Sequence, residues 1–330
     1  MDERRSISHL LLYVLFLSAL LAYSGSGCAE KHSLRPDSIT VMTDGYKTPV
    51  VAVVPKCTTM AFWHSVRAGA ESAGKELGVD VVWSGPASEQ DVEEQKRILD
   101  KYIENKVNAV VFSACDPEAL VETARRAKAE GIVVVTIDSG INDDNIPVSS
   151  VATDNVNAGR QAGHKLAQLI GKKGLVGIIP IIRGVSSSDD RERGFREAIS
   201  CYPDIKQGPV MYSESTVERG RTAAEDMLSR YPDLKGIFAA NEYGGVGAAE
   251  AIRKRKCVGS IKLVAFDSSE PEVKALKDGI IQALIVQDPI SIGFEGVKQA
   301  VNAINGRPVN EYVTTGVKII TTEEINQPLP

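Results

Sequence analysis

Short apolar runs alternate with amphipathic helical patterns along the chain from Pro49 onward, and this alternation limits the fold more than any other feature. Each run is rich in Val and Ile and has the length of a buried strand. Strands that alternate with helical patterns in this way form parallel sheets with helices on both faces. The spacing is that of successive βα units and not that of a solenoid repeat.

The runs fall into two series, and a chain of 330 residues suits two domains of ordinary size. The first series predicts strands at 50–54, 79–83, 108–112 and 132–137, with helices at about 62–77, 90–105 and 117–129. The second predicts strands near 148–152, 175–180, 208–213, 235–240, 261–266 and 280–286, with helices near 155–170, 190–200, 218–231, 244–255 and 289–305. The predicted fold class is α/β, with two doubly wound, Rossmann-like lobes.

The N-terminus has the pattern of an export signal. Arg4 and Arg5 are followed by an uncharged, Leu-rich run at 10–23 and then by small residues up to Gly27. This pattern predicts a signal peptide at 1–27, and the alternative, a membrane anchor helix, is disfavoured because the run is short for a bilayer. Cys28 follows the small residues as in a bacterial lipoprotein cleavage box, so it is the predicted lipidation site. Residues 28–47 are read as a polar tether.

Composition and missing motifs exclude several functions. The net charge of -5 argues against a nucleic-acid binder that relies on a basic face. The cysteines of the mature chain other than Cys28 show no CxxC spacing, so no metal site is predicted, and whether they pair stays open. No HExxH, P-loop or GxSxG motif is present, and the Gly245-x-Gly247 pair is an incomplete dinucleotide fingerprint. We therefore predict no cofactor and no enzymatic activity.

Polar and aromatic side chains gather where the predicted strands end, and ligands of such sheets bind there. Phe62 and Trp63 begin a helix, and adjacent helical residues point about 100° apart, so at least one ring should face a cleft and suit the apolar face of a small polar ligand. Residues that grip hydroxyl groups follow other strands or open a helix: Asp138, Arg191, Asn241, Asp267 and Gln287. Each alone could be a helix cap or turn residue, but together they predict a binding site.

From about 50 to 328 the chain resembles the sugar-binding proteins of ABC importers, of the ribose-binding type (type I periplasmic binding proteins). The stretches that carry the resemblance are Val53-Val54-Pro55-Lys56 with Phe62-Trp63, Ile137-Asp138-Ser139-Gly140, Arg191-Glu192-Arg193-Gly194-Phe195, Ala240-Asn241-Glu242, Phe266-Asp267-Ser268-Ser269 and Val286-Gln287-Asp288-Pro289. The resemblance implies two lobes joined by a three-stranded hinge, with the ligand in the cleft between them. It places 48–152 plus about 288–315 in the N-terminal lobe and 153–287 plus about 316–330 in the C-terminal lobe.

The resemblance also assigns roles to individual residues. Phe62 and Trp63 would sandwich a sugar with an aromatic residue from the other lobe. The polar ligand-binding positions would be Lys56, Ser113, Asp138, Ser139, Arg191, Asn241, Asp267 and Gln287. The arginine that often follows the aspartate is Ser139 here, and Met60 and Ala61 replace a polar pair of many relatives. These departures argue against ribose and predict a less polar or differently shaped ligand.

The predicted function is capture of a sugar or sugar-like molecule outside the cytoplasm and its delivery to the permease of an ABC importer by hinge closure. The protein would be a monomer in the periplasm or at the cell surface, held to the membrane by its lipid anchor, with no nucleic-acid partner. The alternative is a sensor that presents the same kind of ligand to a membrane receptor. A related repressor would need a helix-turn-helix in place of the signal peptide, and a two-domain enzyme would need a nucleophile and a base.

Overall fold

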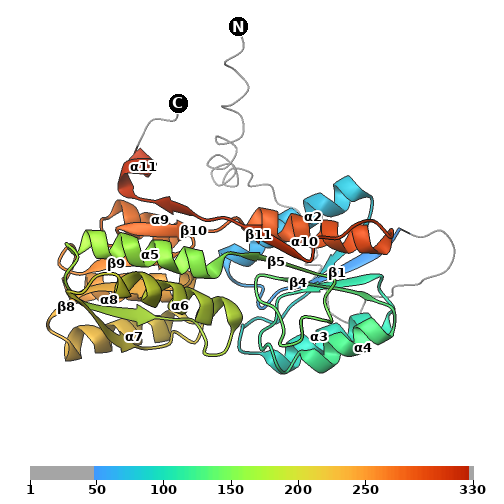
Figure 1. Ribbon diagram of the computed structural model, residues 1–330, viewed down its shortest axis with the longest axis horizontal. Coiled ribbons are helices and arrows are strands. Elements are labelled where there is room, and N and C mark those ends of the chain that lie inside the picture. The colour runs from blue at the N-terminus through green and yellow to red at the C-terminus, as the bar shows by residue number, and fades with distance from the viewer. Residues whose placement is uncertain (1–47, 327–330) are drawn as a thin grey trace, which may run out of the picture. The chain divides into compact units, whose positions relative to one another are not determined.

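The computed structural model describes residues 48–326 and contains two six-stranded sheets with packed helices (Figure 1). The predicted signal peptide, the tether and Cys28 lie outside the described residues, as do 327–330. Within the described part, every helix is too short or too polar to cross a bilayer.

The first sheet has the strand order β11-β5-β4-β3-β1-β2, and all adjacent strands are parallel. Its strands are β1 (Val50–Val54), β2 (Asp80–Trp83), β3 (Ala109–Phe112), β4 (Val133–Ile137), β5 (Ser149–Thr153) and β11 (Tyr312–Thr315). Its helices are α2 (Ala61–Leu77), α3 (Val92–Glu104), α4 (Val121–Ala129) and α10 (Pro289–Ile304). We call this sheet with its helices the first lobe.

The second sheet has the order β12-β10-β9-β8-β6-β7 and is parallel except for the antiparallel edge strand β12. Its strands are β6 (Gly174–Ile179), β7 (Ile205–Val210), β8 (Leu234–Ala239), β9 (Lys262–Phe266), β10 (Ala283–Val286) and β12 (Lys318–Ile320). Its helices are α5 (Asn155–Leu169), α6 (Ser186–Ser200), α7 (Val217–Arg230), α8 (Glu242–Lys254), α9 (Glu270–Lys277) and α11 (Thr322–Asn326). This is the second lobe.

The chain passes between the two sheets three times: between β5 and α5, between β10 and α10, and between β11 and β12. The predicted fold class, two parallel-sheet α/β lobes, is confirmed. One detail differs, because β12 runs against its neighbour β10 and makes the second sheet mixed.

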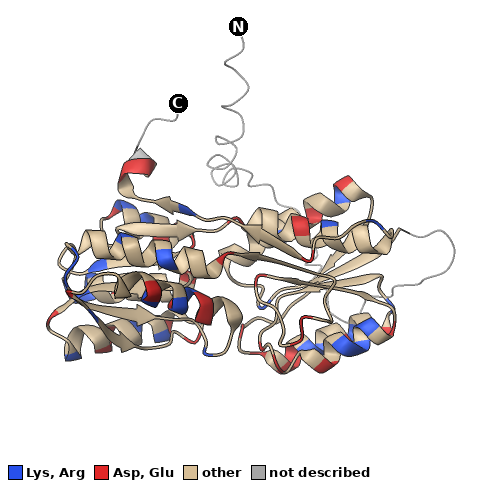
Figure 2. Ribbon diagram, viewed as in Figure 1, with Lys and Arg blue, Asp and Glu red and all other residues tan. Residues whose placement is uncertain are grey.

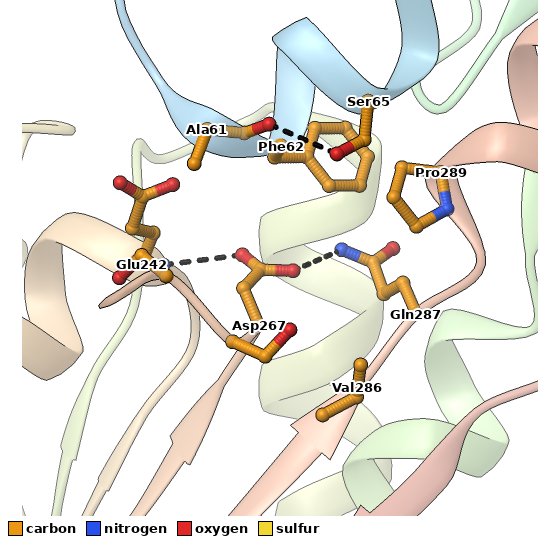
Figure 3. Close-up of a pocket in the computed structure, with 10 residues that line it drawn as sticks. Ala61, Phe62, Ser65, Glu242, Asp267, Val286, Gln287 and Pro289 are labelled. Carbon is orange, nitrogen blue, oxygen red and sulfur yellow. Dashed lines mark hydrogen bonds between the residues drawn. The ribbon is translucent and has the colours of Figure 1, made fainter. Parts of the chain in front are cut away.

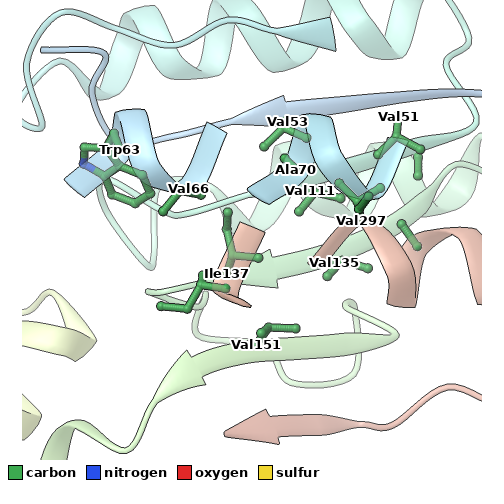
Figure 4. Packing of buried hydrophobic residues seen from close by; sticks show 14 of the residues in the cluster. Val51, Val53, Trp63, Val66, Ala70, Val111, Val135, Ile137, Val151 and Val297 are labelled. Atoms are coloured by element: carbon green, nitrogen blue, oxygen red, sulfur yellow. The ribbon is translucent and has the colours of Figure 1, made fainter. Parts of the chain in front are cut away.

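The central strands are apolar along their whole length because helices cover both of their faces. In the second lobe, Phe238 and Phe266 pack toward α5 and α6, whereas Ile237 and Leu263 pack toward α7 and α8. Successive residues of a strand point to opposite faces of the sheet. The same alternation brings Val51, Val53, Val111 and Val135 of the first lobe against α2 and α10 (Figure 4).

Two glycines let α2 and α10 lie in backbone contact. A Cβ atom on Gly293 would lie 2.0 Å from the carbonyl oxygen of Val66, and one on Gly69 would lie 2.0 Å from that of Ile290. This reciprocal contact fixes α10 on the first lobe, although α10 follows most of the second lobe in the sequence.

The sequence missed four elements of the two lobes: the strands β11 and β12 and the helices α9 and α11, the last of which has only five residues. The strands β11 and β12 are only four and three residues long and lie at sheet edges, so their apolar pattern is weak. Helix α9 has eight residues and begins with a capping box between Ser269 and Glu272 and a proline at its start. Its shortness left no helical period to detect.

Charged side chains of both signs lie together on α3 and α4 (Figure 2). Lys96 pairs with Glu93, and Arg125 pairs with Glu122, all on exposed positions. Each such surface pair is worth little by itself. The charges that matter for function are therefore the buried ones at the strand ends.

Candidate functional site

Strand ends of both lobes border one hollow, which we call the main hollow. It is lined by Lys56, Met60, Phe62, Trp63, Glu89, Asp138, Ile181, Ser187, Arg191, Asn241, Asp267 and Gln287. Eight of the ten residues predicted from sequence are among them. The other two, Ser113 and Ser139, lie behind this lining and hydrogen-bond to Asp138.

A buried ion pair joins the ends of β1 and β4 in the first lobe. Lys56 Nζ lies 2.9 Å from Asp138 Oδ2, and both side chains are almost fully buried. Ser113 and Ser139 donate hydrogen bonds to the same oxygen of Asp138, at 3.1 and 3.0 Å. Burial alone would raise the pKa of Asp138, but the charges of Lys56 and Arg191 outweigh it and lower that pKa. The carboxylate therefore stays ionised and accepts hydrogen bonds.

Arg191 is held by three acceptors and presents a fixed guanidinium to the hollow. Its Nε donates to Asn155 Oδ1 at 2.8 Å, its Nη1 to the Ala240 carbonyl at 2.7 Å, and its Nη2 to Gln287 Oε1 at 2.9 Å. The guanidinium carbon lies 3.9 Å from the ring centroid of Phe266. A side chain oriented in this way loses little further freedom when a ligand binds.

Asp267 is positioned by its backbone and by two donors (Figure 3). It follows β9 with a φ of 79°, a conformation that few side chains other than Asp and Asn adopt readily. Gln287 Nε2 donates to its Oδ1 at 2.7 Å, and the Glu242 backbone N–H donates to its Oδ2 at 3.2 Å. Burial raises the pKa of this carboxyl, although Arg191 opposes the shift.

Asn241 is the one predicted site residue that also caps a helix. Its Oδ1 accepts from the Gly244 N–H at 3.0 Å at the start of α8, and its Nδ2 donates to Ser215 at 3.3 Å. Asp267 does not cap a helix, because the cap of α9 is Ser269. Asp138 does not cap one either, because the next described element after it is the strand β5. The cap interpretation therefore applies to Asn241 alone of the polar set.

The aromatic pair contributes both rings to the main hollow. Phe62 and Trp63 contact edge to face with their centroids 4.9 Å apart, and Trp63 Nε1 donates to Glu89 Oε1 at 3.0 Å. Among the described lining residues, the second lobe contributes Ile181 as its large apolar side chain, at the wall where the resemblance implies a sandwiching aromatic. One wall is therefore aliphatic.

The sequence did not point to Glu89, which is 6% exposed. Glu89 lies in the loop between β2 and α3, several residues beyond the end of its strand. Its Oε2 accepts from the hydroxyl of Ser215 in the second lobe at 2.7 Å. A carboxylate that reaches the hollow from the middle of a longer loop, neither directly after a strand nor at the start of a helix, gives no signal in the sequence.

Direct contacts join the lobes around the hollow. The hydroxyls of Thr59 and Tyr243 lie 3.1 Å apart, and Gln90 Nε2 donates to the Glu214 carbonyl at 2.7 Å. Glu214 and Ser215 both have positive φ, 49° and 48°, which is rare for two consecutive residues of this kind. This strained turn presents the Glu214 carbonyl and the Ser215 hydroxyl to the loop that carries Glu89.

A second hollow of about 330 Å³ adjoins the main one and shares Phe62, Asp267 and Gln287 with it (Figure 3). Glu242, at the first position of α8, lines this side hollow and is 7% exposed. Its carboxylate meets the backbone N–H groups of Ala61 and Phe62 at the start of α2, a helix without a side-chain cap of its own. Burial and the charge of Asp267 raise the pKa of Glu242 to about 7.

The site is built for hydrogen bonding. Among residues 48–326, no group of three His, Cys, Asp or Glu side chains is placed to hold a metal ion. Cys57 and Cys115 are buried near Lys56 with free thiols, and burial raises the pKa of both. Fixed donors and acceptors beside two aromatic rings are the means by which proteins hold small polar ligands.

Comparison with known proteins gives one consistent family. Residues 51–308 match the family described as "Periplasmic binding protein domain". The D-ribose/D-allose-binding protein of Pseudomonas aeruginosa is 30% identical over 284 residues, which cover 83% of this chain and 89% of that protein. The ribose import binding protein of Bacillus subtilis is 27% identical, with 79% of this chain and 83% of that protein covered.

Solved structures agree with the sequence relatives. An ABC transporter solute-binding protein from Agrobacterium vitis, bound with alpha-D-tagatopyranose, matches with a TM-score of 0.83 and 31% identity, covering 85% of this chain and 97% of that one. A carbohydrate transporter solute-binding protein from Agrobacterium radiobacter, in complex with D-arabinose, matches with a TM-score of 0.82 and 32% identity, covering 86% and 98%. The fold is thus shared with proteins whose solved structures hold a monosaccharide.

Proposed function

The chain belongs to the periplasmic binding protein domain family, and from this premise we propose that it captures a sugar or sugar-like molecule outside the cytoplasm and delivers it to an ABC importer. The observation that carries the proposal is the main hollow, which draws oriented charged side chains from both lobes. Lys56 and Asp138 come from the first lobe, and Arg191 and Asp267 come from the second. The protein is a substrate-binding protein and not an enzyme.

Capture works by closure. A ligand that bonds to both lobes gains its full contacts only when the lobes are together, so binding shifts the population toward the closed form. A shift from 1:99 to 99:1 needs about 5.5 kcal/mol of differential affinity, which a few charge-assisted hydrogen bonds supply. The permease would then recognise the closed form.

A thermal-shift screen tests this function. The protein is heated with pentoses, hexoses, polyols and nucleosides, and the hits are titrated by calorimetry. A ligand present at about 100 times its Kd adds about 2.7 kcal/mol to the free energy of unfolding, so the Tm rises. If no sugar or sugar-like compound raises the Tm, the proposed function is wrong.

Removing the Tyr243 hydroxyl should weaken ligand binding without unfolding the protein. Tyr243→Phe removes the bond to Thr59 that forms only when the lobes meet, and such a bond contributes about 0.5–1 kcal/mol, or about a two- to fivefold change in Kd. Tyr212→Phe is the matched control, because its hydroxyl donates to Glu192 within the second lobe. Equal Kd values for both variants and the parent would contradict this role of Tyr243.

Affinity for a neutral sugar should rise as the pH falls from 7 toward 4.5. The pKa of Glu242 is about 7 when it is buried against α2, and opening the lobes returns it toward the ordinary 4.5, so closure takes up a proton in this window. The closed form is therefore favoured at low pH, and the advantage is lost as the pH rises through 7. The charged groups that face Glu242 are Asp267 and Glu272 from the second lobe and Glu89 from the first. All three are acidic.

Calorimetric titrations at pH 7 and 5.5 measure this dependence. Linkage predicts about tenfold tighter binding at the lower pH. Glu242→Gln should flatten most of the slope because Gln does not titrate. An equally steep slope in that variant would assign the effect to another group.

We propose that 48–152 with about 288–315 move as one lobe and that 153–287 with about 316–330 move as the other. The packing of α10 on α2 and the pairing of β11 with β5 support this division. Small-angle scattering with and without the ligand tests for the motion, and an unchanged radius of gyration would count against it.

We also propose that the protein carries a lipid anchor at Cys28 and that it is a monomer. The sequence around Cys28 supports a lipid-anchored protein, and mass spectrometry of the native N-terminus should find acyl groups on Cys28. One chain lines the main hollow from both sides, which supports a monomer. Light scattering of the protein without its anchor should give a mass near that of one chain.

A further inference from the structure

The charges around the two hollows do not balance. In the main hollow Lys56 forms an ion pair with Asp138. Asp267 is the negative charge that acts most strongly on Arg191, and Gln287 hydrogen-bonds to both of these side chains. Two cations thus compensate two anions. Glu89 is a third buried carboxylate there, and among the described residues it forms no ion pair with Lys, Arg or His.

Glu242 adds a fourth carboxylate at the side hollow. It also forms no ion pair among the described residues. Its carboxylate lies near the backbone N–H groups of Ala61 and Phe62, yet its Oε2 is buried without a hydrogen-bond partner. The carboxylate extends toward Ala61, and Asp267 lies beside it on the floor of the same hollow (Figure 3). A buried oxygen that lacks a donor is costly, and it indicates a group that the protein itself does not supply.

We propose that the ligand of this site is a monosaccharide with a protonated amino group, and that Glu242 and Asp267 receive that group at the border of the two hollows. This inference rests on the proposed function. An ammonium group donates up to three hydrogen bonds and carries one positive charge, whereas a hydroxyl donates one bond and carries none. The neighbouring charge would also hold the Glu242 carboxyl in its ionised form.

Calorimetric titration at pH 7 tests the inference. The probes are D-glucose, its amino derivatives at C2, C3 and C6, D-galactose and D-galactosamine, with N-acetyl-D-glucosamine as a form that keeps the nitrogen and lacks the charge. At least one amino sugar should bind 10-fold or more tightly than its parent hexose, and the N-acetyl form should not share the gain.

Two variants assign the preference to this carboxylate. Glu242→Gln keeps the size and removes the charge, and it should reduce the amino-to-parent affinity ratio to less than threefold. Glu71→Gln makes the same change of net charge on the outer part of α2 and should leave the ratio as in the parent protein. A ratio that survives Glu242→Gln overturns the assignment, and thermal melts show whether that variant is folded.

The outcomes also separate this inference from the function on which it rests. If neutral sugars bind and no amino sugar binds more tightly than its parent, the inference is wrong and the sugar-binding function stands. If no sugar of either kind binds, both are wrong.

Discussion

Replacing Asp267 with Asn is expected to lower the affinity for the best sugar ligand about 10- to 150-fold, equivalent to about 1.5–3 kcal/mol. The change removes a charged acceptor from a site closed to water, where charge-assisted hydrogen bonds are strongest. It also places an NH₂ group where one carboxylate oxygen now accepts from Gln287 Nε2 or from the Glu242 N–H. Isothermal titration against the parent protein measures the loss.

Asn is the informative replacement because of the backbone. Asp267 has a φ of 79°, which Asn tolerates and Ala does not, so Asp267→Ala would mix strain with the loss of charge. Asp204→Asn, an exposed change in the same lobe, is the control for net charge. Normal binding together with a much lower Tm would mean that Asp267 serves the fold and not the ligand.

The change Gly293→Ala should lower the free energy of unfolding by about 3 kcal/mol, at the upper end of the usual cost of overpacking. The added methyl carbon would lie 2.0 Å from the Val66 carbonyl oxygen, and this backbone atom cannot turn away as a side chain would. The helices α2 and α10 must therefore separate. For a chain of this size the expected fall in Tm is about 5 °C.

Gly316→Ala provides the matched control for this prediction. An added Cβ at Gly316 meets no atom within 4 Å, so the substitution tests glycine loss without a clash. Thermal melts of both variants and the parent decide the matter. Similar Tm values for Gly293→Ala and the parent would show that the α2–α10 contact adapts at little cost.

The sequence predicted the fold because buried parallel strands and covering helices leave strong patterns. It also found eight residues that line the main hollow: seven follow a strand or open a helix at the edge where ligands of parallel sheets bind, and Lys56 came from the family resemblance. These residues could be found from their positions along the chain, without any knowledge of three-dimensional contacts.

What the sequence could not supply is contact between segments that are distant along the chain. Glu89 and Ser215 meet across the two lobes, and no local pattern in either segment announces the partner. Ser113 and Ser139 look like ligand residues by position, yet both hydrogen-bond to Asp138 behind the lining. Whether a polar side chain faces a hollow or supports its neighbour is decided by packing, which the sequence shows only indirectly.

The interleaving of the lobes sets the order in which this protein is completed. The strands β6 to β10 of the second lobe all lie within 174–286, so that lobe lacks only the short edge strand β12 and the short helix α11 once they are made. The first lobe starts earlier but waits for α10 and for β11, which pairs with β5 at Thr315. Until then the apolar side of α2 is bare and one sheet edge is open, and a lobe folds as a unit. The first lobe, although it begins earlier along the chain, is therefore the later of the two to be completed.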